Sequence, residues 1–462
     1  MTSSAPGGLF SAAYRACTLA VAALFVLVAF AGLALGTVMP LAVQDLDGLG
    51  LYGLAFGGFL TTGMVGTVLG GGSADRRGPA PVLSAGLLCF SGGALLCGTA
   101  TSIAPFVLGR CVQGLGGGAV TVALYVVVGR VYPAALRPRM FSLVTACWIV
   151  PSMVGPPVAG AVAQHLSWAW VFHGIAALGV LALTLPAALL RRLPTTGGED
   201  REEPDGLRLL PATAVALGAG LLQYAGAETG LRRAAAAAAG LVLLAVWVRP
   251  SLPAGSLRAA RGIPSLVLLR GVTAGAYFTI ETYIPLMLVN ERQWSPGTAG
   301  MSLTGAALTW FAGSWLQGHP GLPLPRERVV LAGVLIHGAG TALTLCGTLR
   351  AMPAATVGAG LVIAGFGMGL LLPGIGVLTL EHSPAGRQGR NSASLQLSDN
   401  LCSVLLVGLC GALFNAAHVR VGQDTAAFAA VFALALAVTA AAVPIARRIA
   451  VPPTEEKKHA TV

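Results

Sequence analysis

Charged side chains are scarce in this chain of 462 residues. Asp, Glu, Lys and Arg make up only 10% of it, whereas 55% of the residues are hydrophobic. A soluble globular domain carries about 25% charged residues, so the composition excludes that class. Segments of about ten residues with alternating polar and apolar side chains are also missing, which argues against a transmembrane β-barrel.

Signals for nucleotide, metal and hydrolytic chemistry are missing as well. The glycine runs at 70–72 and 116–118 are followed by no Lys-Ser or Lys-Thr pair, so neither forms a nucleotide-binding loop. The eight cysteines fall in or beside apolar segments without metal-ligand spacing. No cluster of Ser, His and Asp indicates hydrolysis. We therefore expect no enzymatic activity, no cofactor and no metal site.

Apolar runs dominate the rest of the chain. Runs such as Cys17–Val38 and Val329–Leu349 approach the ~20 residues that span a hydrocarbon core. In lipid they must be helices, because the backbone finds no water to bond. The first run is too long for a signal peptide and is expected to remain as a membrane helix. The sequence predicts an all-α, multi-pass membrane protein with fourteen helices, at 16–38, 51–72, 80–100, 105–129, 140–163, 169–190, 207–226, 231–248, 264–289, 297–317, 328–349, 354–380, 391–415 and 425–446.

The predicted helices divide into six, two and six. Carriers are commonly built from two related halves, with the substrate site near the midplane between them. If 207–248 does not cross the membrane twice, the count becomes twelve. We predict an N-terminal six-helix bundle at 1–192, a central linker with two extra transmembrane helices at 193–262, a C-terminal six-helix bundle at 263–449 and a cytoplasmic tail at 450–462.

Positive charges are distributed unevenly over the predicted loops. With the N-terminus inside, 21 of the 28 Lys and Arg residues fall in cytoplasmic segments, five in outer segments, and Arg110 and Arg270 within helices. This bias obeys the positive-inside rule, so the net charge of +11 indicates topology rather than a nucleic-acid partner. We expect the chain in the cell membrane with both termini in the cytoplasm.

A charged loop bounded by glycines joins the second and third predicted helices, at 71–78. Its glycines let two helix ends approach closely, and the carboxylate of Asp75 can pair with cations or cap the next helix. Pro79 and Ala80 follow this loop. The loop resembles a motif of the major facilitator superfamily, although two basic residues usually follow that motif. The residues that match are Gly71, Ala74, Asp75, Arg76 and Gly78. The resemblance implies that these residues take part in conformational change.

The fourth predicted helix places Arg110 and Gln113 on one face. A charge inside a membrane helix is costly, which makes it a functional-site hypothesis; alternatively, Arg110 reaches out to the outer interface. Together with Gly114 and Gly116, these residues resemble the second motif of the drug:proton antiporters in the same superfamily.

The fifth predicted helix contains small residues that permit close packing and prolines that kink it. Gly155, Pro156 and Gly160 are similar to the glycine-proline motif of exporters, and the two extra central helices are typical of the fourteen-helix antiporter branch. That branch often has an aspartate about nine residues before Pro40, where this chain has Ala31. The proton coupling that the resemblance implies must therefore rest on another residue.

Two acidic residues, Glu281 and Asp399, lie well inside predicted spans. Glu281 could carry a proton while facing one side of the membrane and lose it while facing the other, or it could balance a cationic substrate. Alternatively, Glu281 faces a wet vestibule or pairs with Arg110.

Asp399 shares a polar stripe with Gln396 and Asn400, which makes it either a proton-coupling residue or a hydrogen-bonding contact between helices. His337 could titrate, but a lone histidine is more often a packing group.

The remaining site prediction concerns aromatic residues. Such side chains commonly line ligand pockets, although near helix ends they also anchor the membrane interface. The predicted substrate-binding set comprises Glu281, Tyr277, Phe278, Tyr283, Trp310, Arg110 and Gln113.

The sequence thus predicts a proton-coupled secondary active exporter of amphipathic or cationic small molecules, of the multidrug-efflux type, working by alternating access. Its expected partners are a small amphipathic substrate, protons and the lipid bilayer, without nucleic acid, and the chain is expected to be a monomer. One alternative is export of a lipid or natural product. A second is a non-transporting membrane scaffold or receptor on the same fold, which the buried carboxylates disfavour.

Overall fold

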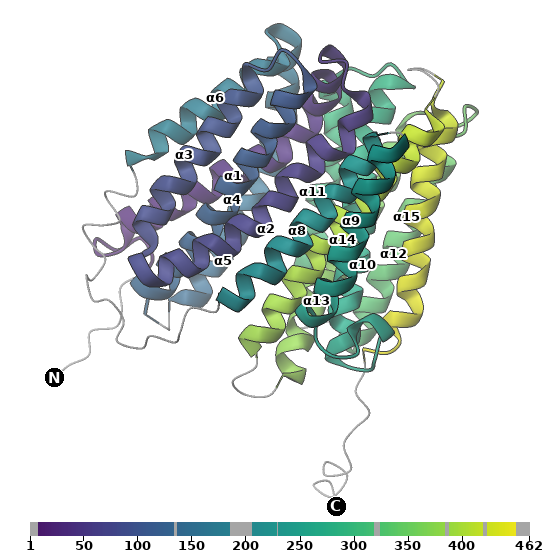
Figure 1. The fold of residues 1–462 in the computed structure, drawn as a ribbon. Helices are drawn as coiled ribbons and strands as arrows, with labels where there is room; N and C mark the ends of the chain where they lie inside the picture. Colours follow the sequence, from purple (N-terminus) through teal and green to yellow (C-terminus); the bar gives the residue numbers. More distant parts are fainter. Residues whose placement is uncertain are drawn as a thin grey trace, which may run out of the picture.

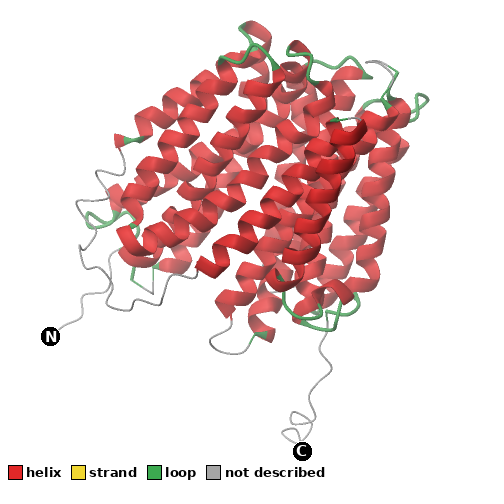
Figure 2. Ribbon diagram, in the orientation of Figure 1, coloured by secondary structure: helices red, strands yellow, loops and turns green. Residues whose placement is uncertain are grey.

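The protein is described by a computed structural model covering residues 8–133, 136–184, 206–228, 230–317, 324–383, 388–418 and 423–449. Within these ranges the chain forms helices and no strands (Figure 2), which confirms the predicted all-α class. Two short 3-10 helices, Leu49–Leu51 and Ser256–Arg258, occur in connections. The α-helices are α1 (Arg15–Asp45), α2 (Tyr52–Arg77), α3 (Pro79–Gly98), α4 (Ile103–Val131), α5 (Arg137–His165), α6 (Trp168–Ala182), α8 (Gly206–Ala227), α9 (Gly230–Ser251), α10 (Ile263–Asn290), α11 (Pro296–Gln317), α12 (Arg326–Cys346), α13 (Ala355–His382), α14 (Gln388–Ala417) and α15 (Thr425–Ala446).

The ends of α1 and α2 differ from the predicted helix ends, and the predicted sixth helix, 169–190, extends beyond the described residues, which stop at 184. Helix α1 continues through Pro40 to Asp45 rather than ending at 38, and α2 includes most of the charged segment predicted as a loop. A proline is tolerated inside a membrane helix because neighbouring groups satisfy the freed backbone positions. Pro40 is therefore not a helix end in this chain.

Ten helices in the described part of the chain are long and apolar enough to cross a membrane, by length and composition. They include α9 but not α8, and α6 is a shorter apolar helix. The chain is thus a multi-pass helical membrane protein.

The helices pack in three sets (Figure 1). Helices α1–α6 pack against one another and form the N-terminal helix group, and α10–α15 form the C-terminal helix group. Helices α8 and α9, the central pair, pack together, and α8 contacts both α2 and α14. Gln223 of α8 lies 2.9 Å from the Val404 carbonyl of α14, to which it donates a hydrogen bond.

The two ends of the helix bundle differ in how the two helix groups meet. We call the end where α1 begins and α15 ends the terminal face, and the other end the opposite face (Figure 1). At the opposite face, the Gln44 amide donates to Asn290, and Asn415 donates to the Gly50 carbonyl at 2.5 Å. Hydrogen bonds between the two helix groups therefore connect them at this face.

Candidate functional site

Glu281 lies in α10, about two thirds of the way from the terminal face to the opposite face. Its side chain is half-buried, and it makes no hydrogen bond or ion pair within the described ranges of the chain. Most of α10 around it is buried. An ionisable group left without a partner in a membrane helix is costly, which marks a functional position.

Aromatic rings surround the helical turn before Glu281. Tyr277, four residues earlier on the same face of α10, is buried, and its ring meets Trp310 of α11 edge-on at 5.0 Å between centroids. The rings of Phe278 and His337 lie 5.9 Å and 6.0 Å from that of Tyr277. Three of the four predicted aromatic residues thus lie close to Glu281, on helices α10 and α11.

Tyr283 lies apart from this cluster. Its ring contacts Tyr52 of α2 at 5.5 Å and Phe414 of α14 at 5.9 Å, and its buried hydroxyl has no hydrogen-bond partner in the part of the chain that the structure describes. Beside it, the Tyr52 hydroxyl donates to the Thr282 carbonyl at 2.7 Å. Tyr283 therefore belongs to the contact between the two helix groups near the opposite face.

Arg110 and Gln113 form a second buried polar site, between α2 and α4. The Arg110 guanidinium donates to Gln113 Oε1 at 2.7 Å and to the Ala55 carbonyl at 3.2 Å, and it lies 4.6 Å from the centre of the Phe59 ring. Arg110 is only 2% exposed, so it does not extend to the membrane interface. Among the described residues, the buried side-chain nitrogen of Gln113 has no hydrogen-bond partner.

Asp399 of α14 forms an ion pair with Arg270 of α10. Arg270 Nε and one terminal nitrogen lie 2.7 Å and 2.6 Å from the same carboxylate oxygen. Gly271 and Gly275 permit this approach, because a Cβ at Gly271 would lie 2.3 Å from the Ser398 hydroxyl. Sequence reasoning missed Arg270 as a site residue, although it was one of two arginines found inside predicted helices.

The conformational motifs occupy two different contacts. Gly78, with φ of +83°, forms the turn between α2 and α3, a backbone conformation that favours glycine. Arg130 at the end of α4 donates to the Ala74 carbonyl at 3.2 Å. The motif residues Gly71, Asp75 and Arg76 lie in the last turns of α2, and the side chains of Asp75 and Arg76 lie outside the described residues.

Gly155, Pro156 and Gly160 are buried on α5, and the last two face α11. A Cβ at Gly160 would lie 2.5 Å from the Gly297 Cα, and one at Gly300 would lie 3.3 Å from Pro156. The predicted glycine-proline motif thus forms a close helix crossing between the two groups near the opposite face.

The Gly160→Val substitution is expected to separate α5 from α11 at this crossing. The larger side chain overpacks the contact, which costs about 1–3 kcal/mol of stability. In detergent, and with the exposed Cys346 replaced by Ala, a cysteine introduced at the buried Ala299, next to Gly300 on α11, should react about tenfold faster with a maleimide. Gly174→Val is the matched control, because a Cβ at Gly174 meets no atom within 4 Å. Equal reaction rates for the two valine variants would contradict the predicted role of the crossing.

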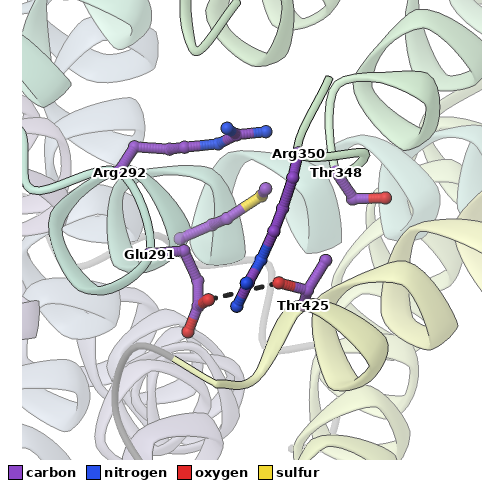
Figure 3. Close-up of a pocket in the computed structure, with 6 residues that line it drawn as sticks. Glu291, Arg292, Thr348, Arg350 and Thr425 are labelled. Carbon is purple, nitrogen blue, oxygen red and sulfur yellow. Dashed lines mark hydrogen bonds between the residues drawn. The ribbon is translucent and has the colours of Figure 1, made fainter. Parts of the chain in front are cut away.

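A cavity of about 220 Å³ lies at the opposite face of the C-terminal helix group (Figure 3). Glu291 accepts hydrogen bonds there from the Asp424 backbone at 2.9 Å and the Thr425 hydroxyl at 3.2 Å. Arg292 and Arg350 extend toward the same space (Figure 3). This cavity lies almost three helical turns from Glu281 along α10, so it is separate from the predicted substrate site.

Together, the helical fold and its spans define a multi-pass membrane protein with buried polar sites inside its helix groups. The family model for the Major Facilitator Superfamily matches residues 19–407. The chain belongs to this superfamily.

Curated relatives and solved structures extend the comparison. A probable multidrug-efflux transporter of Mycobacterium tuberculosis is 26% identical over 433 residues, which cover 89% of each chain. The multidrug transporter protein MdtP of Bacillus subtilis is 24% identical over 394 residues, covering 83% of this chain and 72% of MdtP. A crystal structure of the peptide transporter POT in complex with sulfate has a TM-score of 0.68 and 16% identity and covers 94% of both chains. The POT family transporter PepTSo has a TM-score of 0.69 and 14% identity, covering 93% of this chain and 98% of PepTSo. These structures share the fold of this chain.

Proposed function

We propose that the protein is a proton-coupled exporter of amphipathic or cationic small molecules. The observation that carries this proposal is the Glu281 carboxylate, which has no hydrogen-bond or ion-pair partner among the described residues and lies one turn from the Tyr277–Trp310 ring pair. An apolar aromatic wall with one acidic group suits a lipophilic cation. The names of the relatives from M. tuberculosis and B. subtilis, both of them multidrug transporters, support the same substrate class.

In the proposed mechanism, the proton and the cationic substrate compete for Glu281 in alternation. We assign the terminal face to the cytoplasm, so the contacts at the opposite face close the carrier toward the outside. Ala31, where an acid is expected in the antiporter branch, is buried in α1, which leaves coupling to Glu281. Asp399 stays a candidate for coupling, although its ion pair with Arg270 favours a structural role.

The other predicted site residues receive narrower roles. Arg110 holds α4 against α2 through the Ala55 carbonyl, and we infer that the Gln113 amide nitrogen, which has no partner among the described residues, bonds a bound substrate. Tyr283 acts in closing the opposite face rather than in lining the aromatic site. Asp75 and Arg76 stabilise one conformation at the terminal face.

A transport assay tests this function directly. Everted membrane vesicles that contain the protein should accumulate a fluorescent cationic dye when a proton gradient is imposed, and the accumulation should collapse when the gradient is dissipated. A non-transporting scaffold would show no dye movement. Accumulation of a fluorescent lipid but of no dye would favour the lipid exporter instead.

We further propose the fourteen-span topology, with a six-helix bundle at 1–192, two added spans within 193–262, a second bundle at 263–449 and both termini in the cytoplasm. Helices α8 and α9 support it, because Gly226 at the end of α8 accepts a hydrogen bond from Asn415 at 3.2 Å, near the opposite face. Helix α8 would then cross from the terminal face to the opposite face, and α9 would return.

Cysteine labelling on intact cells tests this topology. With Cys346 replaced by Ala, a cysteine at Leu231, which is 85% exposed at the start of α9, should react with a membrane-impermeant maleimide. A cysteine at Leu257, exposed in the connection before α10, should react only after permeabilisation. Labelling of the Leu231 position only in permeabilised cells would contradict fourteen spans.

A further inference from the structure

The cavity at the opposite face gathers two arginines from different parts of the C-terminal helix group. Its lining residues are Met287, Glu291, Arg292, Thr348, Arg350 and Thr425. Arg292 follows the end of α10, and Arg350 extends toward the cavity from the connection between α12 and α13 (Figure 3). Both belong to the five Lys and Arg residues that fall in predicted outer segments. Two arginines and one carboxylate give the lining a net charge of +1.

Both guanidinium groups have hydrogen-bond donors left. One terminal nitrogen of Arg292 donates to the Gly347 and Leu349 carbonyls at 2.9 Å and 2.7 Å, and its other two nitrogens have no acceptor among the described residues. Arg350 makes no hydrogen bond or ion pair with any residue that the structure describes. A guanidinium carries five N–H donors in a planar fork that fits the oxygens of a phosphate or a carboxylate. The cavity is therefore suited to an anion.

Glu291 does not supply that anion. Its two carboxylate oxygens accept hydrogen bonds from the Asp424 backbone and the Thr425 hydroxyl, at the start of α15. It forms no ion pair with Arg350. The carboxylate is thus used to hold α10 against α15, and the donors of the two arginines stay available to a ligand.

The surface that leads to the cavity is apolar and belongs to a membrane span. Helix α12 is long and apolar enough to cross a membrane. Its exposed residues Leu335, Ala339 and Cys346 share one face, because they follow one another at helical spacing. Leu349, which is 59% exposed, lies in the turn after α12 and directly precedes Arg350. In a bilayer, acyl chains cover an exposed apolar face of a span, and the headgroups lie where the span ends.

We propose that this cavity binds the phosphate diester of a phospholipid, whose acyl chains lie along the exposed face of α12. The phosphate oxygens accept hydrogen bonds from the Arg350 guanidinium and from the free nitrogens of Arg292, which are strong because both partners are charged. The single negative charge of the diester balances the net charge of the lining. Since one water takes about 30 Å³ of liquid, a cavity of about 220 Å³ has room for the phosphate and the carbons esterified to it.

A bound headgroup connects the end of α10 to the connection between α12 and α13. Arg292 lies two residues after Asn290, which accepts a hydrogen bond from Gln44 of the N-terminal helix group. The lipid site therefore lies beside a contact between the two helix groups at the opposite face. It is separate from Glu281 and does not depend on which substrate the protein transports.

Native mass spectrometry of the purified, delipidated protein in detergent tests the site, because each bound lipid adds its own mass. The titrated probe is dioctanoyl phosphatidylglycerol. In the Arg350→Gln variant, the dissociation constant of the first bound lipid should rise at least about tenfold, since a charge-assisted contact with the phosphate is lost. The variant is expected to fold normally, because Arg350 has no partner among the described residues.

Arg233→Gln is the matched control. Arg233 is an exposed arginine at the start of α9, near the same face, and it does not line the cavity. Its dissociation constant for the lipid should stay within about twofold of that of the unmodified protein. Equal lipid affinities of the Arg350→Gln variant and the unmodified protein would overturn the proposal.

Two further probes separate the phosphate from the acyl chains. Dioctanoylglycerol has the same chains without phosphate, and glycerophosphoglycerol is the same diester without chains. Each should bind at least about tenfold more weakly than the phospholipid. Equally tight binding of dioctanoylglycerol would overturn recognition of the phosphate. Equally tight binding of glycerophosphoglycerol would overturn the lipid and assign the cavity to a soluble phosphate ester.

Discussion

Replacing Glu281 with Gln is expected to abolish proton-driven dye accumulation while the protein is still produced and inserted at its normal level. Glutamine fills the same space in α10 but cannot release a proton, so the competition between proton and substrate is lost. We expect the initial rate to fall by at least about tenfold. Because the Glu281 side chain has no partner within the described ranges, the substitution removes no hydrogen bond or ion pair that holds the fold.

The measurement is dye uptake in everted vesicles, normalised to the amount of protein in the membrane. Glu291→Gln is the matched control, since Glu291 lies on the same helix but binds the start of α15 at the opposite face. Dye uptake by the Glu291→Gln variant should stay well above uptake by the Glu281→Gln variant. Normal uptake by Glu281→Gln would remove this residue from the coupling mechanism.

Removing Asp399 is expected to produce the largest loss of stability. Asp399→Ala leaves the Arg270 guanidinium without its carboxylate between α10 and α14. Breaking a buried ion pair in this way costs roughly 3–5 kcal/mol. Because the Arg270 side chain is 20% exposed, we expect a loss near the lower value, about 3 kcal/mol. Removing both charges together, as Arg270→Met with Asp399→Leu, should restore most of the stability, since no unpaired charge remains.

The readout is the midpoint of thermal unfolding in detergent. The exposed pair Arg326–Glu381, 3.8 Å apart with side chains about half exposed, supplies the control: Glu381→Ala should cost less than about 1 kcal/mol. An equal midpoint for Asp399→Ala and Glu381→Ala would contradict the structural role. If the double variant is stable but does not transport, Asp399 also takes part in coupling.

The helices follow from hydropathy, because each apolar run must satisfy its own backbone in lipid. The relative register of two helices does not follow from it. Arg270 and Asp399 are 129 positions apart in the chain, and their pairing depends on how closely Gly271 lets α10 approach α14. The sequence could show that both charges were buried, but it could not show that they meet.

The separation of Tyr283 from the aromatic site was open to prediction. At 100° per residue, Tyr277 and Glu281 share one face of α10, whereas Tyr283 points almost to the opposite side. Among the described residues, neither ring nitrogen of His337 has a hydrogen-bond partner. This could not be foreseen, because a histidine among small residues gives no sign of whether a neighbouring helix offers it a partner. That question is decided by the packing of α10, α13 and α15 around it.

Proton release on substrate binding tests the central claim most directly. Tetraphenylphosphonium is added to the purified protein in weakly buffered detergent solution, at a pH where Glu281 is protonated, and released protons are recorded with a pH-sensitive dye. The account predicts about one proton released per cation bound, and none from Glu281→Gln. Binding of the cation without proton release, or equal release from the Glu281→Gln variant, would contradict it.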